Sequence, residues 1–157
     1  MVALEWEELR ALRLEALLDS PRSYGSTHAQ NAALSDEEWQ QRALTGAAGV
    51  EEVAFAAVAD GRWVGMARGY LDPPAAHLIA VYVTAAWRRQ GLASALSAAV
   101  VAWARERGAH EIFLSVSDWN TGARRVYEAL GFEGTGVQRS LPWNADVSES
   151  EMRLRLA

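Results

Sequence analysis

The chain has 157 residues and contains neither cysteine nor lysine. Without cysteine it has no disulfide framework, no thiolate metal site and no cysteine nucleophile. Without lysine it cannot form a Schiff base, and it lacks the Gly-Lys-Ser/Thr end of a phosphate-binding loop. These absences exclude phosphate-loop nucleotide hydrolases and leave few side chains that could carry a covalent intermediate.

Several other motifs are missing as well. No Gly-x-Gly-x-x-Gly occurs, which argues against a Rossmann dinucleotide site, and no Gly-x-Ser-x-Gly occurs, which argues against a hydrolase nucleophile elbow. The histidines at positions 28, 77 and 110 lie far apart and lack the spacing of metal ligands. We therefore expect no metal centre.

Long apolar runs and clustered positive charge are also absent. No apolar run reaches about 18 residues, and glutamates stand near the N-terminus, where a secretory signal needs basic residues. The formal charge is −5 and the arginines are scattered without interleaved aromatic residues. We expect a cytoplasmic protein that binds neither membrane nor nucleic acid, and the negative charge suits a cationic acceptor.

The remaining pattern predicts one α/β domain over residues 1–157, with two helices before the sheet. The first helix ends at Asp19-Ser20-Pro21, and the second starts at the capping box Ser35 to Glu38. Asp60-Gly61 predicts a tight hairpin. A long helix crosses over between two parallel strands, so the sheet must be mixed. We expect strands at 53–59, 62–71, 77–83, 111–117, 136–140 and 151–156, with Leu141, Pro142 and Trp143 in the last loop.

The segment Arg88–Ser94 predicts an anion-binding site at a helix start. An apolar strand, Leu78–Val83, precedes it. The apolar stripe that follows at helical spacing consists of Leu92, Ala95, Leu96, Ala99, Val100 and Trp103. Free N–H groups at such a start can hold a phosphate or pyrophosphate, and Gly91 and Ala93 leave room for close approach. An ordinary exposed helix start with two solvated arginines would have the same sequence, so this segment alone leaves both interpretations open.

A further helix, after the strand at 111–117, is predicted from Asn120 to Gly131. Asn120 is a sound N-cap, and Gly131 ends the helix. Ala123, Val126, Tyr127 and Leu130 form an apolar stripe. Packing explains the stripe but does not explain why one of its members is a tyrosine.

Together the two segments resemble the GNAT superfamily of N-acyltransferases. Residues 88–93 are similar to the acyl-CoA signature Gln/Arg-x-x-Gly-x-Gly/Ala, and residues 120–132 are similar to Asn-x-x-Ala-x-x-x-Tyr-x-x-x-Gly-Phe. The resemblance implies the GNAT fold, an α/β (α+β) architecture with a central, mixed, twisted β-sheet of six to seven strands flanked by four helices. Its first strand would fall in residues 1–5, where there is room only for a truncated or frayed edge strand.

The resemblance implies transfer of an acetyl group from acetyl-CoA, the acyl-donor substrate, to a primary amine. The pantetheine arm would pair with the strand that precedes the anion site, and a backbone N–H near Val83 would polarise the thioester carbonyl. The implied cofactor-binding residues are Val81, Val83, Arg88, Arg89, Gln90, Gly91, Ala93, Ser94 and Asn120.

Two residues are implied to move protons. Tyr127 would lie near the CoA sulfur as general acid, provided the site brings a phenol, with a pKa of about 10, closer to a thiol, at about 8.5. His77 takes a position where the family often has a glutamate, and imidazole can accept a proton near neutral pH. A core tyrosine and a packing histidine are the open alternatives. Because no cysteine or lysine can hold the acetyl group, we expect direct attack in a ternary complex.

These motifs do not identify the acceptor. In the family it binds near two loops, which here carry Tyr24, His28, Trp143 and Asn144. Their aromatic rings could bind a cation or ring, or could be buried in a homodimer. A small-molecule amine and a peptide amine both stay open, and so does an acyl-CoA-binding module that senses the donor without turnover.

Overall fold

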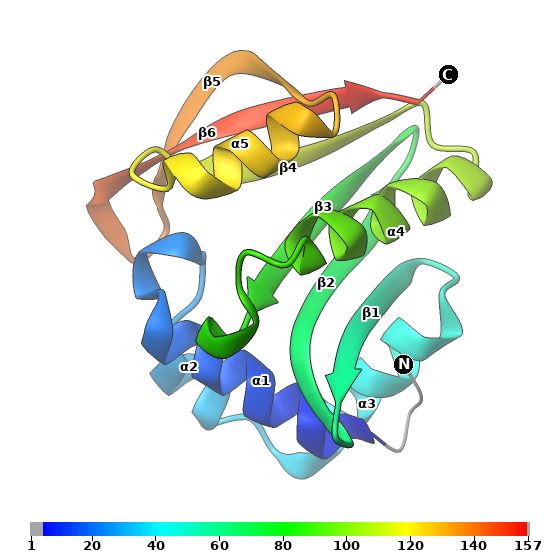
Figure 1. The fold of residues 1–157 in the computed structure, drawn as a ribbon, viewed down its shortest axis with the longest axis vertical. Coiled ribbons are helices and arrows are strands. Elements are labelled where there is room, and N and C mark those ends of the chain that lie inside the picture. The colour runs from blue at the N-terminus through cyan, green and yellow to red at the C-terminus, as the bar shows by residue number, and fades with distance from the viewer. Residues whose placement is uncertain (1–4, 157) are drawn as a thin grey trace.

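The computed structural model describes residues 5–156, whose six strands form one mixed β-sheet in the order β1-β2-β3-β4-β6-β5 (Figure 1). The predicted mixed sheet is therefore confirmed. The strands are β1 (Glu52–Ala59), β2 (Arg62–Asp72), β3 (Ala75–Val83), β4 (Glu111–Ser117), β5 (Glu133–Leu141) and β6 (Asn144–Arg155). The helices are α1 (Trp6–Asp19), α2 (His28–Ala32), α3 (Asp36–Ala48), α4 (Leu92–Glu106) and α5 (Thr121–Ala129), with short 3₁₀ turns η2 (Pro21–Ser23) and η3 (Ala85–Trp87).

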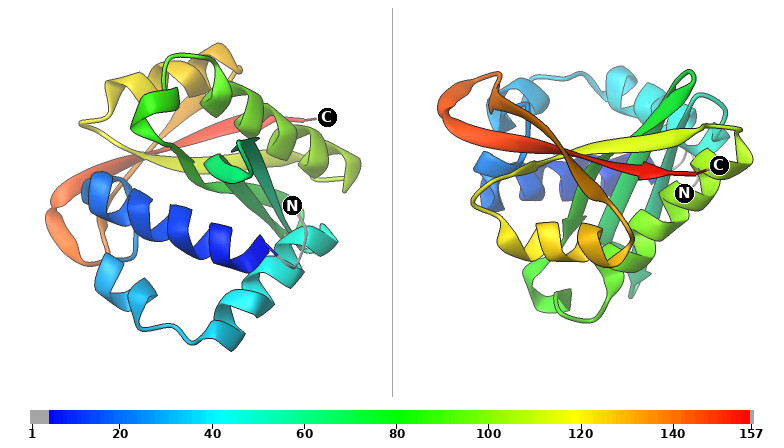
Figure 2. Two further views of the ribbon diagram at one scale, coloured as in Figure 1. Left: turned by 60° about the horizontal axis from the view of Figure 1, so that its bottom comes forward. Right: turned by 90° about the horizontal axis from the view of Figure 1, so that it is seen from above.

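Two apolar clusters lie on opposite faces of the sheet. On one face α1 and α3 pack against β1 and β2 around the fully buried Trp39 and Met66. On the other face α4 packs against β1, β2 and β3, and α5 lies beside it (Figure 2). The C-terminal part of β3 is covered by helices on both sides, and this placement builds the site. None of the helices within residues 5–156 is long and apolar enough to cross a membrane.

Local signals fix several element ends as predicted. Ser35 Oγ accepts the Glu38 N–H at 3.2 Å, and the Glu38 carboxylate accepts the Ser35 N–H at 2.9 Å. Asp60 and Gly61 have φ angles of 52° and 75°, as a type I′ hairpin requires. The prediction of four helices was wrong, because α2 begins inside the predicted loop. It has only 5 residues, too few to show helical periodicity.

Helix α4 buries a face turned slightly from the predicted one. Ala95 was expected in the apolar stripe but is exposed, and Ser97 is buried instead. The helix also lies close to β2, where a Cβ added to Gly69 would stand 2.6 Å from Val100 Cγ1. Small residues fill much of α4, so the apolar spacing alone defines its buried face only loosely.

The parallel strands β3 and β4 pair over a short stretch and then separate. Their register joins Ala75–His77 to Glu111–Phe113, and no further pairing follows within the described residues. Ala80 has a φ of 54°, and the pairing of β3 with β2 shifts beside it, so β3 bulges where it leaves β4. The carboxyl ends of the two adjacent strands therefore diverge in a V (Figure 1).

The closing hairpin is longer than predicted. Strands β5 and β6 extend over Glu133–Leu141 and Asn144–Arg155, so only Pro142 and Trp143 remain of the expected loop. The residues of β5 and β6 are mostly polar and exposed, so the alternation of apolar residues that predicts a strand is weak in both. The expected truncated first strand falls mainly on residues 1–4, outside the described residues.

Candidate active site

A cavity of about 550 Å³ occupies the V between β3 and β4. It brings together most of the residues that the sequence pattern assigned to the cofactor. Gln90 is the one that does not line it. The predicted residues that do line it are Val81, Val83, Arg88, Arg89, Gly91, Ala93, Ser94, Asn120 and Tyr127.

The start of α4 has the geometry of an anion cradle. Arg89 and Gly91 both have left-handed backbone angles, with φ of 63° and 80°. No side chain caps the helix, and the Ala95 N–H donates to the Gly91 carbonyl at 3.0 Å. A Cβ on Gly91 would meet no atom within 4 Å. The N–H groups of the first turn therefore lack a side-chain cap, and the space beside Gly91 is open.

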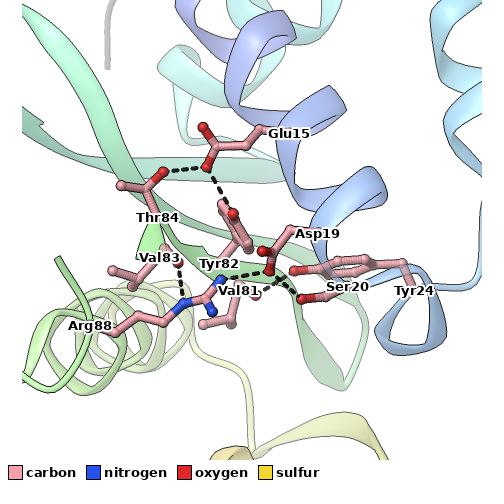
Figure 3. A network of polar contacts seen from close by, with 9 residues as sticks. All are labelled: Glu15, Asp19, Ser20, Tyr24, Val81, Tyr82, Val83, Thr84 and Arg88. Carbon is pink, nitrogen blue, oxygen red and sulfur yellow. Dashed lines mark hydrogen bonds and ion pairs between the residues drawn. The ribbon is translucent and has the colours of Figure 1, made fainter. Parts of the chain in front are cut away.

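The Arg88 side chain serves the scaffold in this structure. Its Nε donates to the Val83 carbonyl at 2.9 Å, and its Nη2 lies 2.6 Å from Asp19 Oδ2 (Figure 3). The hydrogen bonds from Ser20 and Arg88 lower the pKa of Asp19, and Asp19 in turn raises the pKa of Arg88. Its backbone N–H donates to the Ala85 carbonyl at 3.4 Å, so in this structure Arg88 braces β3 and leaves the cradle to the residues that follow it.

The end of β3 is held by α1 at the point where β4 no longer supports it. Tyr82 donates to the Glu15 carboxylate at 2.8 Å, and the Thr84 hydroxyl donates to the same oxygen (Figure 3). Tyr24 Oη donates to the Val81 carbonyl at 3.0 Å. Both carbonyls of the predicted pantetheine-binding residues, Val81 and Val83, are thus already bonded to side chains. The N–H of Val83 shares the side of its carbonyl, because both groups of a strand residue point the same way.

Tyr127 lies in α5 with its side chain buried against the cavity. Burial raises the pKa of its hydroxyl to about 12, so the group is protonated at neutral pH. The ring packs edge-on against Phe132 at 6.1 Å, and the hydroxyl has no hydrogen-bond partner among residues 5–156. Asn120 caps the same helix by accepting the Ala123 N–H at 3.0 Å.

A second cavity of about 730 Å³ meets the first at the splayed strands. Tyr24, Ala80 and Ser115 line both. His77 lines the second cavity only, so the structure places it apart from Tyr127. Its Nε2 lies 3.2 Å from Asp72 Oδ2, and its ring stacks on Tyr70 at 4.7 Å.

The second cavity also contains charged residues that the sequence reading did not single out. Arg13 comes from α1, Arg42 from α3, Arg68 from β2 and Glu149 from β6. Burial raises the pKa of the Glu149 carboxyl, opposed by Arg139. The only sequence signal was an arginine, Arg68, inside an otherwise apolar strand. The others meet because helices and strands distant in sequence converge here.

An uncapped helix start beside two splayed parallel strands defines a site for an extended, phosphate-bearing ligand. The chain belongs to the acetyltransferase (GNAT) family, whose sequence model matches residues 6–132. It is 34% identical over 91 residues to an aminoglycoside N(6′)-acetyltransferase type 1 of Salmonella typhimurium. That match covers 52% of this chain and 63% of the relative, so it spans less than two thirds of the relative's length.

Solved structures agree on the fold. An acetyltransferase of the GNAT family from Streptococcus pneumoniae superposes with a TM-score of 0.85 at 19% identity, over 100% of this chain and 96% of the other. A putative acetyltransferase from Salmonella typhimurium, solved with its cofactor acetyl-CoA, gives a TM-score of 0.82 at 16% identity, over 100% and 91% of the two chains.

Proposed function

We propose that this chain transfers an acetyl group from acetyl-CoA to a primary amine. The observation that carries the proposal is the line of three features across the sheet: the open cradle at α4, the cavity between β3 and β4, and the second cavity beyond the splay. A donor with phosphates and a long arm fits the first two, and an acceptor fits the third. The family and the named relative support this assignment.

The residues present fit acetyl-CoA as donor. The N–H groups between Arg89 and Ser94 would hold its pyrophosphate, and the space above Gly91 leaves them accessible. The Val83 N–H would face the thioester carbonyl and stabilise the charge that develops on its oxygen. The donor supplies an activated acetyl thioester, which needs no metal.

Tyr127 would donate a hydrogen bond to the departing sulfur. Its pKa of about 12 keeps the phenol protonated, but burial moves it further from a thiol, whose pKa is about 8.5. Complete proton transfer would then be uphill by about 3.5 pKa units, or roughly 5 kcal/mol. We therefore propose that the proton is only partly transferred while the C–S bond breaks.

The attacking amine must lose a proton on the acceptor side of the sheet. His77, paired with Asp72, lines that cavity and could accept the proton through water. Glu149 lines the same cavity as a half-buried carboxylate and is a second candidate base. A pH–rate profile of the His77→Gln and Glu149→Gln variants separates them, because only loss of the base removes the acid limb.

We propose direct attack within a ternary complex. The nitrogen forms a bond to the acetyl carbon while the C–S bond breaks and the electron pair leaves with sulfur. Acetyl-CoA mixed with the protein without acceptor should leave the protein mass unchanged, and a stable acetylated protein would contradict direct transfer.

The decisive experiment is calorimetric titration of acetyl-CoA into the wild-type protein and into Gly91→Trp. We expect the substitution to abolish binding because the indole fills the cradle. Gly108→Trp is the matched control: this glycine ends the same helix with a φ of 81° and also has open space around it. If the wild type does not bind acetyl-CoA, the proposal fails. Binding without turnover of any amine would favour a donor-sensing module.

A further inference from the structure

The acceptor cavity carries an excess of positive charge that its own acidic residues do not balance. Arg13, Arg42, Arg68 and Arg139 line it, against two carboxylates, Glu52 and Glu149. Arg139 is already paired with Glu151 at 3.2 Å, and its side chain is exposed. The unbalanced charge therefore resides on the three arginines from α1, α3 and β2.

Arg13 is largely buried. Burial lowers the pKa of its guanidinium to about 10, and nearby Arg68 and Arg42 act in the same direction. Nη2 donates to Ser26 at 3.2 Å, and the guanidinium lies 4.8 Å from the Tyr24 ring centroid. Nη1 is buried without a hydrogen-bond partner, and Arg13 has no ion pair within residues 5–156.

Arg68, which comes from β2, likewise lacks a close carboxylate partner. Its nearest carboxylate is that of Glu52, with 3.8 Å between the charged atoms, beyond hydrogen-bond distance. Its Nε is buried without a partner in the described part of the chain. A buried donor of a charged group costs free energy when it makes no hydrogen bond. Both guanidinium groups line one cavity, and neither is neutralised by a hydrogen-bonded carboxylate of the described residues. Such a pair of guanidinium groups can bind a carboxylate through charge-assisted N–H···O bonds.

These observations argue against a polycationic acceptor. An aminoglycoside or polyamine would place ammonium groups next to Arg13 and Arg68. The negative charge of the whole chain suggested a cationic acceptor, but the local charge at the cavity has the opposite sign. Donor phosphates do not account for the arginines either, because the cradle at α4 lines the other cavity.

We propose that the acceptor is a small primary amine that also carries a carboxylate, as amino acids do, with the carboxylate held by Arg13 and Arg68. The inference rests on the proposed acetyl transfer. The amine then lies toward Ala80 and Ser115, where the two cavities meet. Arg42, which donates to Asn31 at 3.3 Å, supports the arginine pair by its charge.

The test measures thiol release from acetyl-CoA with the common L-amino acids and with their carboxamides. The amide has the less basic, intrinsically more available amine, so preference for the acid must come from the protein. We expect kcat/KM to favour the acid about tenfold or more for the best substrate. Aminoalkylphosphonates distinguish a carboxylate pocket from a phosphate pocket, and a polyamine serves as the cationic comparison.

Arg13→Gln and Arg68→Gln should each raise KM for the acid about tenfold or more, and should raise KM for the amide much less. Arg105→Gln, at an exposed position on α4, is the control. The inference is overturned if the wild type prefers amides, polyamines or phosphonates, or if both substitutions leave the preference intact; acetyl transfer would then still stand. If no amine is acetylated, calorimetry of the CoA-loaded protein with the same acids decides: binding lost in Arg13→Gln supports the pocket, and absence of binding overturns it.

Discussion

At the scale of single residues, the Tyr127 hydroxyl can be removed with little structural cost. The residue is buried against the cavity and its hydroxyl has no hydrogen-bond partner among the described residues, so Tyr127→Phe leaves no group newly unsatisfied. We expect kcat to fall on the order of 10²-fold, while acetyl-CoA affinity stays the same and the melting temperature changes by less than about 2 °C. Steady-state kinetics, calorimetry and thermal melts check this. An unchanged kcat would contradict a role at the leaving sulfur.

Glu149, in the acceptor cavity, should make the stability of the protein depend on pH. Its folded-state pKa is raised above the ordinary 4.5, first by burial, so the ionised form is disfavoured in the folded protein. The resulting loss of stability is absent below the unfolded pKa and grows as pH rises through it, levelling off above the folded pKa. Glu149→Gln should therefore raise the melting temperature at pH 7 and have little effect near pH 4. Glu133→Gln, at an exposed position, should show no such difference. A gain independent of pH would contradict the electrostatic cause.

The sequence predicted one side of the site better than the other. The cradle and the segment from Asn120 to Phe132 are each contiguous in sequence, and their caps, glycines and apolar spacing are local signals. All of the residues predicted to bind acetyl-CoA, except Gln90, line the cavity. The acceptor side could not be predicted in the same way. Arg13 and Arg68 are 55 positions apart and become neighbours only when α1 packs on β2. No short motif can encode that proximity.

At the scale of elements, the contact between α4 and β2 depends on Gly69. A Cβ there would stand 2.6 Å from Val100 Cγ1 and 3.2 Å from the His77 carbonyl oxygen. Gly69→Ala should cost about 1–3 kcal/mol of unfolding free energy, measured by denaturant titration. Adding Val100→Ala should recover part of this loss, so the double variant is less destabilised than the sum of the two. Gly122→Ala, with no atom closer than 3.8 Å, is the control and should be neutral or stabilising. Full additivity would contradict a direct clash.

The elements themselves were predicted to different degrees for physical reasons. The hairpin at Asp60-Gly61 and the strand 111–117 are set by local turn chemistry and strong apolar runs, and both were predicted correctly. Strand β6 is stabilised by pairing with β4 and β5 on its two edges, and its polar residues face outward. Because partners and not composition make it a strand, its first seven residues, Asn144–Ser150, escaped the prediction.

At the scale of the whole molecule, the sheet consists of two parts joined by few strand contacts. Strands β1 to β3 form one part and β4 to β6 the other. Within the described residues the strands of the two parts pair over Ala75–His77 with Glu111–Phe113, and just before this pairing the His110 N–H donates to the Pro74 carbonyl at 2.9 Å. By contrast, β4 pairs with β6 along its whole length. The carboxyl end of β3 depends on Glu15 and Tyr24 for its position. A ligand lying in the V would contact both parts and bridge β3 and β4 where the two strands no longer pair.

We therefore expect acetyl-CoA to slow amide hydrogen exchange on both walls of the V, at 78–83 in β3 and 114–117 in β4, as well as at the cradle. The melting temperature should rise by about 5–10 °C at one hundred times the dissociation constant, because binding then adds about 2.7 kcal/mol. Gly91→Trp should show neither effect, and Gly108→Trp should show both. Protection confined to 88–94 would mean that the donor binds through its phosphates alone. In that case its arm does not lie between the strands, and the Val83 N–H and Tyr127 could not reach the thioester.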